Sequence, residues 1–139
     1  MLQKSKLSKY LENNPAVWVP DMPEGVPPEE ICIPHEHVLY RLIKEENATE
    51  EDLKTYYEND PNKEWGANQA EAYAVSMYDD LSKTNRLIKI ASLKNSKAVA
   101  KIVLNPKDGV VNQTFHKYHY SWWKTDRFDI NSVEIVQTL

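Results

Sequence analysis

The stretch KAVAKIVL, residues 97–104, decides the fold class, because its polar and apolar side chains alternate. The even-numbered positions from Ala98 to Leu104 are apolar and share one face of an extended chain, while Lys97 and Lys101 lie on the other face. This alternation is typical of a strand that has one face in the core and one face in water, as in antiparallel sheets. We therefore expect an antiparallel sheet in the C-terminal half of the chain.

Three further strands are expected after residue 104. Asn105-Pro106-Lys107-Asp108-Gly109 predicts a turn, since Pro suits its second position and Gly can adopt positive φ. Val110 to Phe115 can then return antiparallel. The other two candidates, rich in aromatic or β-branched residues, are Tyr118 to Trp123 and Ser132 to Thr138.

The N-terminal half contains most of the expected helices. They cover residues 4–14, the segment from Thr49 to Tyr56 or Tyr57, residues 67–74, and the segment from Asp79-Asp80 to about Ala91. His37 to Ile43 is short and rich in β-branched or aromatic residues, which predicts a strand. Tyr73 to Tyr78 fits either a strand or a helix.

Proline is concentrated near the N-terminus. Six of the eight prolines lie between residues 15 and 34, interleaved with apolar residues such as Trp18 and Ile31. Proline fixes φ and removes a backbone donor, so this segment is expected to be extended and outside any central strand. Cys32, the one cysteine, cannot form an internal disulfide, and its isoleucine neighbours predict a buried thiol.

These elements predict an α+β protein. N-terminal helices and a Pro-rich arm, residues 15–35, are expected to pack on a mostly antiparallel sheet of four to six strands. The length of 139 residues suits a single globular domain over residues 1–139. A chain of this size buries enough surface to fold without a metal or a disulfide.

Several classes of protein are disfavoured by composition. No apolar run is long enough to span a membrane and the N-terminus leads into no signal-type stretch, so a cytoplasmic protein is expected. Three glycines are too few for a phosphate-cradling loop, and no cofactor motif is present. The four histidines form two close pairs, at 35/37 and 116/119, whose spacing matches no strong metal signature, so no metal is expected.

Charge is distributed unevenly along the chain. Residues 45–80 carry eleven acidic and two basic side chains, whereas residues 81–107 carry seven basic and no acidic ones. The basic segment 81–107 is a candidate for nucleic-acid binding. The alternative is that the two halves neutralise each other within one domain, and the net charge of -4 favours this alternative and makes nucleic acid an unfavoured partner.

The segment 115–128 combines aromatic and basic residues and is the main candidate for a contact surface. On a strand, one face of it would be core and the other would offer flat rings to a ligand or a protein partner. The alternative is a central strand that is buried on both faces. The candidate binding residues are His116, Tyr118, His119, Tyr120, Trp122, Trp123 and Arg127.

These observations favour a small cytosolic binding, regulatory or accessory protein that contacts a protein partner or a small ligand through segment 115–128. An enzyme is the second hypothesis. The order of five residues along the chain resembles the order of the NAD-binding and catalytic groups in ADP-ribosyltransferase-like domains. These residues are Arg41, Ser76, Tyr78, His119 and Glu134. That resemblance implies a split α+β sheet and an NAD-consuming activity, for which Arg41, Ser76 and His119 would have to meet in one cleft.

Overall fold

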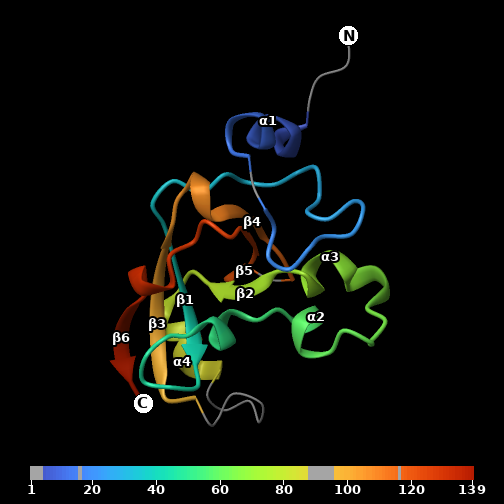
Figure 1. Cartoon of the computed structure of the whole chain (residues 1–139). Helices are drawn as coiled ribbons and strands as arrows, with labels where there is room; N and C mark the ends of the chain where they lie inside the picture. Colours follow the sequence, from blue (N-terminus) through green and yellow to red (C-terminus); the bar gives the residue numbers. More distant parts are fainter. Residues whose placement is uncertain (1–4, 16, 88–95, 116) are drawn as a thin grey trace.

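The computed structural model describes residues 5–15, 17–87, 96–115 and 117–139, which form a single small α+β domain (Figure 1). The described α-helices are α1 (Lys6–Asn13), α2 (Tyr56–Asn59), α3 (Gln69–Ala72) and α4 (Leu81–Arg86). The strands are β1 (His37–Ile43), β2 (Val75–Tyr78), β3 (Ala98–Leu104), β4 (Gly109–Gln113), β5 (His119–Lys124) and β6 (Glu134–Thr138). Short 3-10 turns occur at η1 (Glu50–Leu53), η2 (Gly66–Asn68), η4 (Pro106–Asp108) and η5 (Ile130–Ser132).

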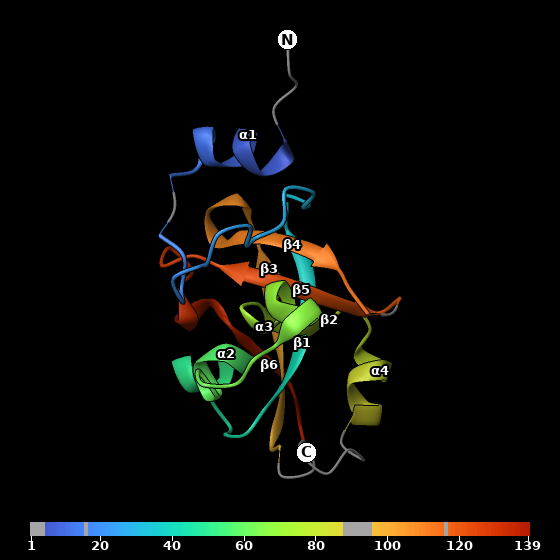
Figure 2. The ribbon, with the colours of Figure 1, turned by 90° about the vertical axis from the view of Figure 1, so that its right-hand side faces the viewer.

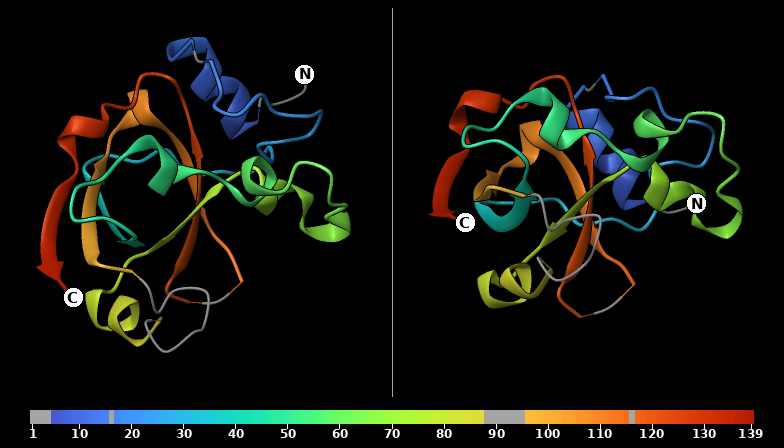
Figure 3. Two further views of the ribbon diagram at one scale, coloured as in Figure 1. Left: turned by 60° about the horizontal axis from the view of Figure 1, so that its bottom comes forward. Right: turned by 90° about the horizontal axis from the view of Figure 1, so that it is seen from below.

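The six strands form one open antiparallel sheet in the order β4-β5-β2-β1-β3-β6. Figure 3 shows that the sheet is curved, and Figure 2 shows α1 above it and α4 near its opposite end. Pairing between β1 and β3 extends over seven positions, whereas β1 and β2 pair at one position, Tyr40 with Tyr78. The sheet is therefore split near its centre, along the line between β1 and β2.

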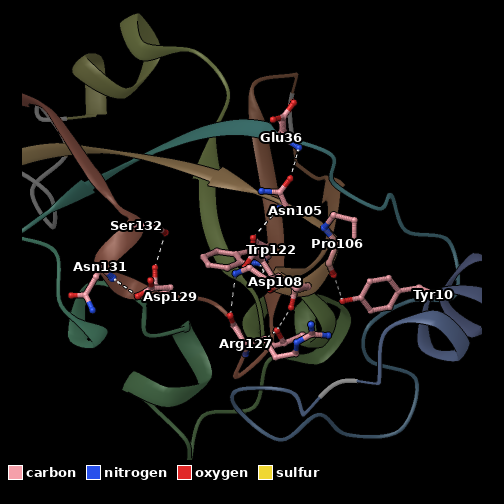
Figure 4. A network of polar contacts seen from close by, with 12 residues as sticks. Tyr10, Glu36, Asn105, Pro106, Asp108, Trp122, Arg127, Asp129, Asn131 and Ser132 are labelled. Atoms are coloured by element: carbon pink, nitrogen blue, oxygen red, sulfur yellow. Dashed lines mark hydrogen bonds and ion pairs between the residues drawn. The ribbon is translucent and has the colours of Figure 1, made fainter.

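The expected hairpin between residues 97–104 and 110–115 is wrong, although both strands exist. β3 pairs with β1 and β6, and β4 pairs with β5 at the far edge of the sheet. Residues 105–109 form a corner instead of a hairpin turn: the Asp108 N–H donates to the Asn105 carbonyl at 2.9 Å and closes a 3-10 turn, and the Asp108 carboxylate caps it by accepting the Asn105 N–H at 2.7 Å (Figure 4). The chain leaves this corner toward the opposite edge of the sheet.

Side chains from distant parts of the sequence bind the same corner. The Trp122 Nε1–H donates to the Asp108 carbonyl at 3.0 Å, and the Tyr10 hydroxyl donates to the Pro106 carbonyl at 2.6 Å. The Glu36 N–H donates to the Asn105 side chain at 3.0 Å (Figure 4). Burial raises the pKa of Tyr10 to about 12, so its hydroxyl remains a donor across the physiological range.

Two of the expected helices differ in detail. The helix expected from Thr49 is interrupted at Thr55, which is a second N-cap: its side chain accepts the Glu58 N–H at 3.1 Å, and α2 starts there. The helix from Asp80 is present as α4, capped by the Asp80 carboxylate, and its expected continuation to Ala91 lies outside the described residues. The ambiguous segment Tyr73 to Tyr78 contains strand β2.

Both faces of the sheet are covered by apolar side chains. One face carries a cluster formed by Leu39, Leu53, Val75, Met77, Ile102, Leu104, Val111 and Trp122. The other face carries a second cluster, in which Tyr10 and Ile31 cover Ala74, Val110 and Trp123. Two-sided burial is what makes a near-continuous apolar strand stable in water.

The proline-rich N-terminal segment runs along the β4 edge. Isolated bridges pair Trp18 with Thr125 and Cys32 with Val111. The prediction that Cys32 is buried is wrong: its thiol is exposed, because alternation along the bridged chain turns Ile31 into the core and Cys32 outward. Within the described part of the chain, no helix has the length and apolarity that a membrane span requires.

Gly109 provides a test of the corner. It has φ of +130°, and a Cβ there would lie 2.0 Å from the backbone oxygen of Trp123. We expect Gly109→Ala to lower the free energy of unfolding by more than about 3 kcal/mol, because backbone strain and a backbone clash add. Gly66→Ala is the matched control, since its φ is +55° with no atom within 4 Å, and it should cost about 1 kcal/mol. Urea denaturation measures both, and equal losses would contradict the assigned role of the corner.

Candidate functional site

The aromatic segment 115–128 lies mostly inside the protein. Trp122 and Trp123 are 0% exposed and point to opposite faces of the sheet. Their indole N–H groups donate to the carbonyls of Asp108 and Ala70, each at 3.0 Å. The expectation that these two rings belong to an exposed contact surface is therefore wrong, and the alternative of a strand buried on both faces describes them correctly.

The other candidate residues of this segment are dispersed. His119 is buried and its Nδ1 lies 2.9 Å from the Thr114 hydroxyl, which is also 2.8 Å from the Ser121 hydroxyl. Tyr118 is half-buried under the Lys83 ammonium, 4.8 Å from its ring centroid, and Arg127 is exposed beyond β5. Tyr120 is half-buried beneath His37, and His116 lies outside the described residues.

Arg41 occupies the split between β1 and β2. Its Nε donates to the Asp52 carbonyl at 2.6 Å and its Nη1 to the Ser76 carbonyl at 2.7 Å. The side chain thus replaces the direct ladder bonds that β1 and β2 lack at this level. Burial lowers the pKa of Arg41, against the smaller opposing effects of Tyr56 and Asp52, but a guanidinium remains charged in proteins.

A cleft of about 280 Å³ opens beside this guanidinium. Its walls include Ser76 and Tyr78 from β2 and Tyr56 and Asn59 from α2, while Lys44 and Lys54 join Arg41 as cations. The lining of this cleft contains no carboxylate among the described residues. Burial also raises the pKa of Tyr78, so its phenol is neutral and can donate a hydrogen bond.

A second hollow of about 400 Å³ continues the cleft past Arg41 and Lys44. Two of its three acidic residues, Glu51 and Asp52, have close partners, and the third, Glu45, lies 3.8 Å from Lys97. The Asp52 carboxylate accepts the backbone N–H groups of Lys44 and Thr49, at 3.1 and 2.8 Å, and Glu51 pairs with Lys54 at 2.8 Å. No salt bridge joins Arg41 itself to a carboxylate within the described ranges.

The enzyme hypothesis required Arg41, Ser76 and His119 to converge in one cleft, and the structure brings only Arg41 and Ser76 of these three together. Arg41, Ser76 and Tyr78 line the cleft. His119 lies behind Tyr78, with ring centroids 5.1 Å apart, and is not part of the lining. Glu134 is on the edge strand β6, paired in register with Lys101, whose Nζ lies 3.8 Å from its carboxylate.

The basic segment 81–107 is partly neutralised by the rest of the domain. Lys97 lies 3.8 Å from Glu45, and Lys107 lies 2.8 Å from Asp108. Lys89 and Lys94 lie outside the described residues. Of these two pairs, Lys97 with Glu45 joins the basic segment to the acidic segment 45–80, whereas Asp108 lies outside that acidic segment. In the described part of the chain, no cluster of three or more His, Cys, Asp or Glu side chains is arranged to hold a metal ion.

Comparisons with protein-family models, curated proteins and solved structures find no match for this chain. The assignment of a site therefore depends on its own residues. Sequence reasoning found Arg41, Ser76 and Tyr78, and missed Lys44, Lys54 and Tyr56. In the sequence, lysines beside glutamates in an acidic segment are interpreted as surface charges in water. Nothing in the spacing of these residues shows that the fold brings them beside Arg41 of β1.

His37 is expected to make the stability of the folded protein depend on pH. Its half-buried ring meets Tyr120 edge-on at 5.1 Å, and burial lowers its pKa below 6.5, opposed by Asp79. The unfolded state, with a histidine pKa of about 6.5, thus binds the proton more readily than the folded state. The contribution of His37 to stability is present above about pH 6.5 and is lost as the pH falls toward the lower folded value.

We therefore expect the melting temperature to fall between about pH 7.5 and 5.5, and to fall less in His37→Gln. Thermal denaturation followed by circular dichroism measures the difference, with Lys9→Gln, an exposed substitution on α1, as control. Equal losses in the wild type and His37→Gln would contradict the assigned direction of the shift.

Proposed function

We propose that this protein is a small binding protein, of regulatory or accessory type, that holds a phosphate-bearing small molecule in the cleft between β1 and β2. The observation that carries the proposal is the Arg41 guanidinium, a half-buried charge that contacts carbonyl oxygens and lines a cleft. Removing a charge from water without a salt bridge is costly, and the carbonyl bonds and the nearby Asp52 carboxylate compensate only in part. An anion in the cleft would complete the compensation.

The donors that remain on Arg41 suit an anion with several oxygens. A guanidinium has five N–H donors, of which the two carbonyls use one each. Planar donor pairs match phosphate and carboxylate oxygens in bidentate geometry. Because the two hydrogen bonds fix the guanidinium before a ligand arrives, little side-chain entropy remains to be lost on binding.

The rest of the lining supports a small molecule over a macromolecule. Lys44 and Lys54 supply two further cations, and Tyr56 and Tyr78 supply flat rings and hydroxyls. The two connected hollows, of about 280 and 400 Å³, lie in the size range of sites for small ligands. A phosphate beside Arg41 with a ring against the tyrosines fits this arrangement.

Binding is favoured over NAD-consuming chemistry by the position of the carboxylates. Transfer or hydrolysis of the nicotinamide group in the resemblance would depend on Glu134, which lies on edge strand β6 beside Lys101. The contact surface first expected at 115–128 is less favoured, because two of its rings belong to the core. NAD is nevertheless a useful test ligand, since it carries a pyrophosphate.

The direct test is isothermal titration calorimetry with pyrophosphate, AMP and NAD, and with adenosine as the uncharged counterpart of AMP. We expect the phosphate-bearing ligands to bind and adenosine to bind at least about tenfold more weakly, because the charge supplies most of the affinity. Raising the salt concentration should weaken binding further, since Lys44 and Lys54 are accessible to solvent.

Substitutions locate the site. Lys44→Gln with Lys54→Gln should weaken pyrophosphate binding about tenfold or more, and Lys6→Gln with Lys9→Gln, which also removes two charges but from α1, should leave it unchanged. Arg41→Lys keeps the charge but loses the planar pair of N–H donors, so it should weaken binding further. Equal binding of AMP and adenosine, or equal effects of the cleft and α1 variants, would overturn the proposal.

A further inference from the structure

A second pocket, distinct from the cleft, has three aromatic walls. We call it the aromatic pocket: Tyr56, Trp65, Asn68, Glu71, Ala72 and Phe115 line it, and its volume is about 220 Å³. The Tyr56 and Trp65 rings contact each other at 5.9 Å between centroids with an interplanar angle of 45°, so they form two inclined walls. Its size suits one chemical group and not a whole drug-sized ligand.

Two of the walls are aromatic rings in water. Tyr56 is 52% exposed and Phe115 is 62% exposed. Phe115 also has φ of +63°, in the left-handed region that a phenylalanine rarely adopts. Both features cost stability and gain little packing, which indicates that the ring is positioned for a contact outside the fold.

Two of the residues that line the pocket each have a polar atom without a hydrogen-bond partner in the part of the chain that is described. Trp65 Nε1 and Glu71 Oε2 are both buried and unpartnered among the described residues. The core residues Trp122 and Trp123 each donate their indole N–H to a backbone carbonyl. Within the described ranges, the indole N–H of Trp65 makes no such bond. A buried carboxylate oxygen without a partner is costly, and a cation in the adjacent pocket would lower that cost through electrostatic attraction.

Electrostatics around the pocket favour a positive group. Five of its six residues come from the segment 45–80, which carries eleven acidic side chains against two basic ones. Cation binding to one of its walls is already seen: the Lys63 Nζ lies 4.4 Å from the centroid of the Trp65 ring. The negative faces of aromatic rings attract cations most when water is excluded.

We propose that the aromatic pocket binds a methylated ammonium group. Three rings and one carboxylate provide attraction for a cation but few hydrogen-bond acceptors, whereas an unmethylated ammonium has three N–H donors to satisfy. A methylated ammonium has fewer or none and loses less hydration on entering. The group could come from a small cation such as choline or from a methylated lysine in a peptide, since both present the same chemistry.

Calorimetric titration of the full-length protein with choline tests the charge requirement. The control ligand is 3,3-dimethylbutanol, its uncharged isostere. We expect choline to bind at least about fivefold more tightly than the isostere, because the two differ in charge and hardly in shape. Equal binding of the two ligands, or no binding of any methylated ammonium, would overturn the proposal.

Variants then test the position. Glu71→Gln should weaken choline binding at least about fivefold and Phe115→Leu should weaken it by a smaller factor, whereas Glu46→Gln, an exposed acid of the same segment, should have no effect. Equal binding by Glu71→Gln and Glu46→Gln would overturn the assignment. Circular dichroism spectra of all three variants separate loss of the pocket from loss of the fold.

Two peptide arms identify the source of the group. A short peptide with one trimethyllysine is compared with the same peptide unmethylated and with choline. Tighter binding of the methylated peptide than of choline assigns a peptide partner, and equal affinities assign a free small cation. The site shares Tyr56 with the cleft but none of its cations, so choline binding should persist in Lys44→Gln and fail independently of pyrophosphate binding.

Discussion

The hydrogen bonds of the Asp108 carboxylate hold the point on which the topology depends. Asp108 is buried, and its two oxygens accept the Asn105 N–H and the Lys107 ammonium, at 2.7 and 2.8 Å. Between β3 and β4 the chain crosses from one side of the sheet to the other, so a turn that reversed it would give another fold. The backbone around Asp108 is in turn bound by Trp122, so β5 is joined to the corner. An unpaired buried carboxylate would cost more than the bonds contribute, which makes the corner sensitive to change.

Because the corner sends β4 to the far edge, β5 becomes an inner strand with a neighbour on each side. Its two adjacent tryptophans, Trp122 and Trp123, then point to opposite faces of the sheet, one into each apolar cluster. The residues that look most like a recognition surface in the sequence are therefore the ones that the core requires. Recognition is left to positions where packing is incomplete, and these lie at the β1–β2 split and on the short helices between η1 and β2.

Local sequence predicted these strands well: alternation indicated Ala98–Leu104, where Ala98, Ala100, Ile102 and Leu104 are buried, and β-branched and aromatic content indicated His37–Ile43. It could not predict how the strands pair, because the Asn105–Gly109 segment suits a hairpin as well as a corner, and the contacts that hold the corner include side chains distant in sequence, those of Tyr10 and Trp122. Another error arose because two local signals compete. The segment from Thr49 was expected to form one helix, but a second capping box at Thr55 starts a new helix there. For the site, Arg41 and Ser76 were found from their order, while Trp65 and Glu71 were missed because an isolated ring and an acid in an acidic segment have no distinctive spacing.

The split of the sheet and the cleft have one physical origin. Where β1 and β2 separate, carbonyls of both the strand and the adjacent turn face a gap, and buried carbonyls must find donors. Arg41 supplies those donors to Ser76 and Asp52, and so a charged group enters the interior for a structural reason. Backbone carbonyls compensate only in part for the desolvation of this charge, so the guanidinium would be further stabilised by an anion. A residue that repairs the sheet thereby forms the charged wall of a cleft, which explains how the proposed site can arise without any sequence motif.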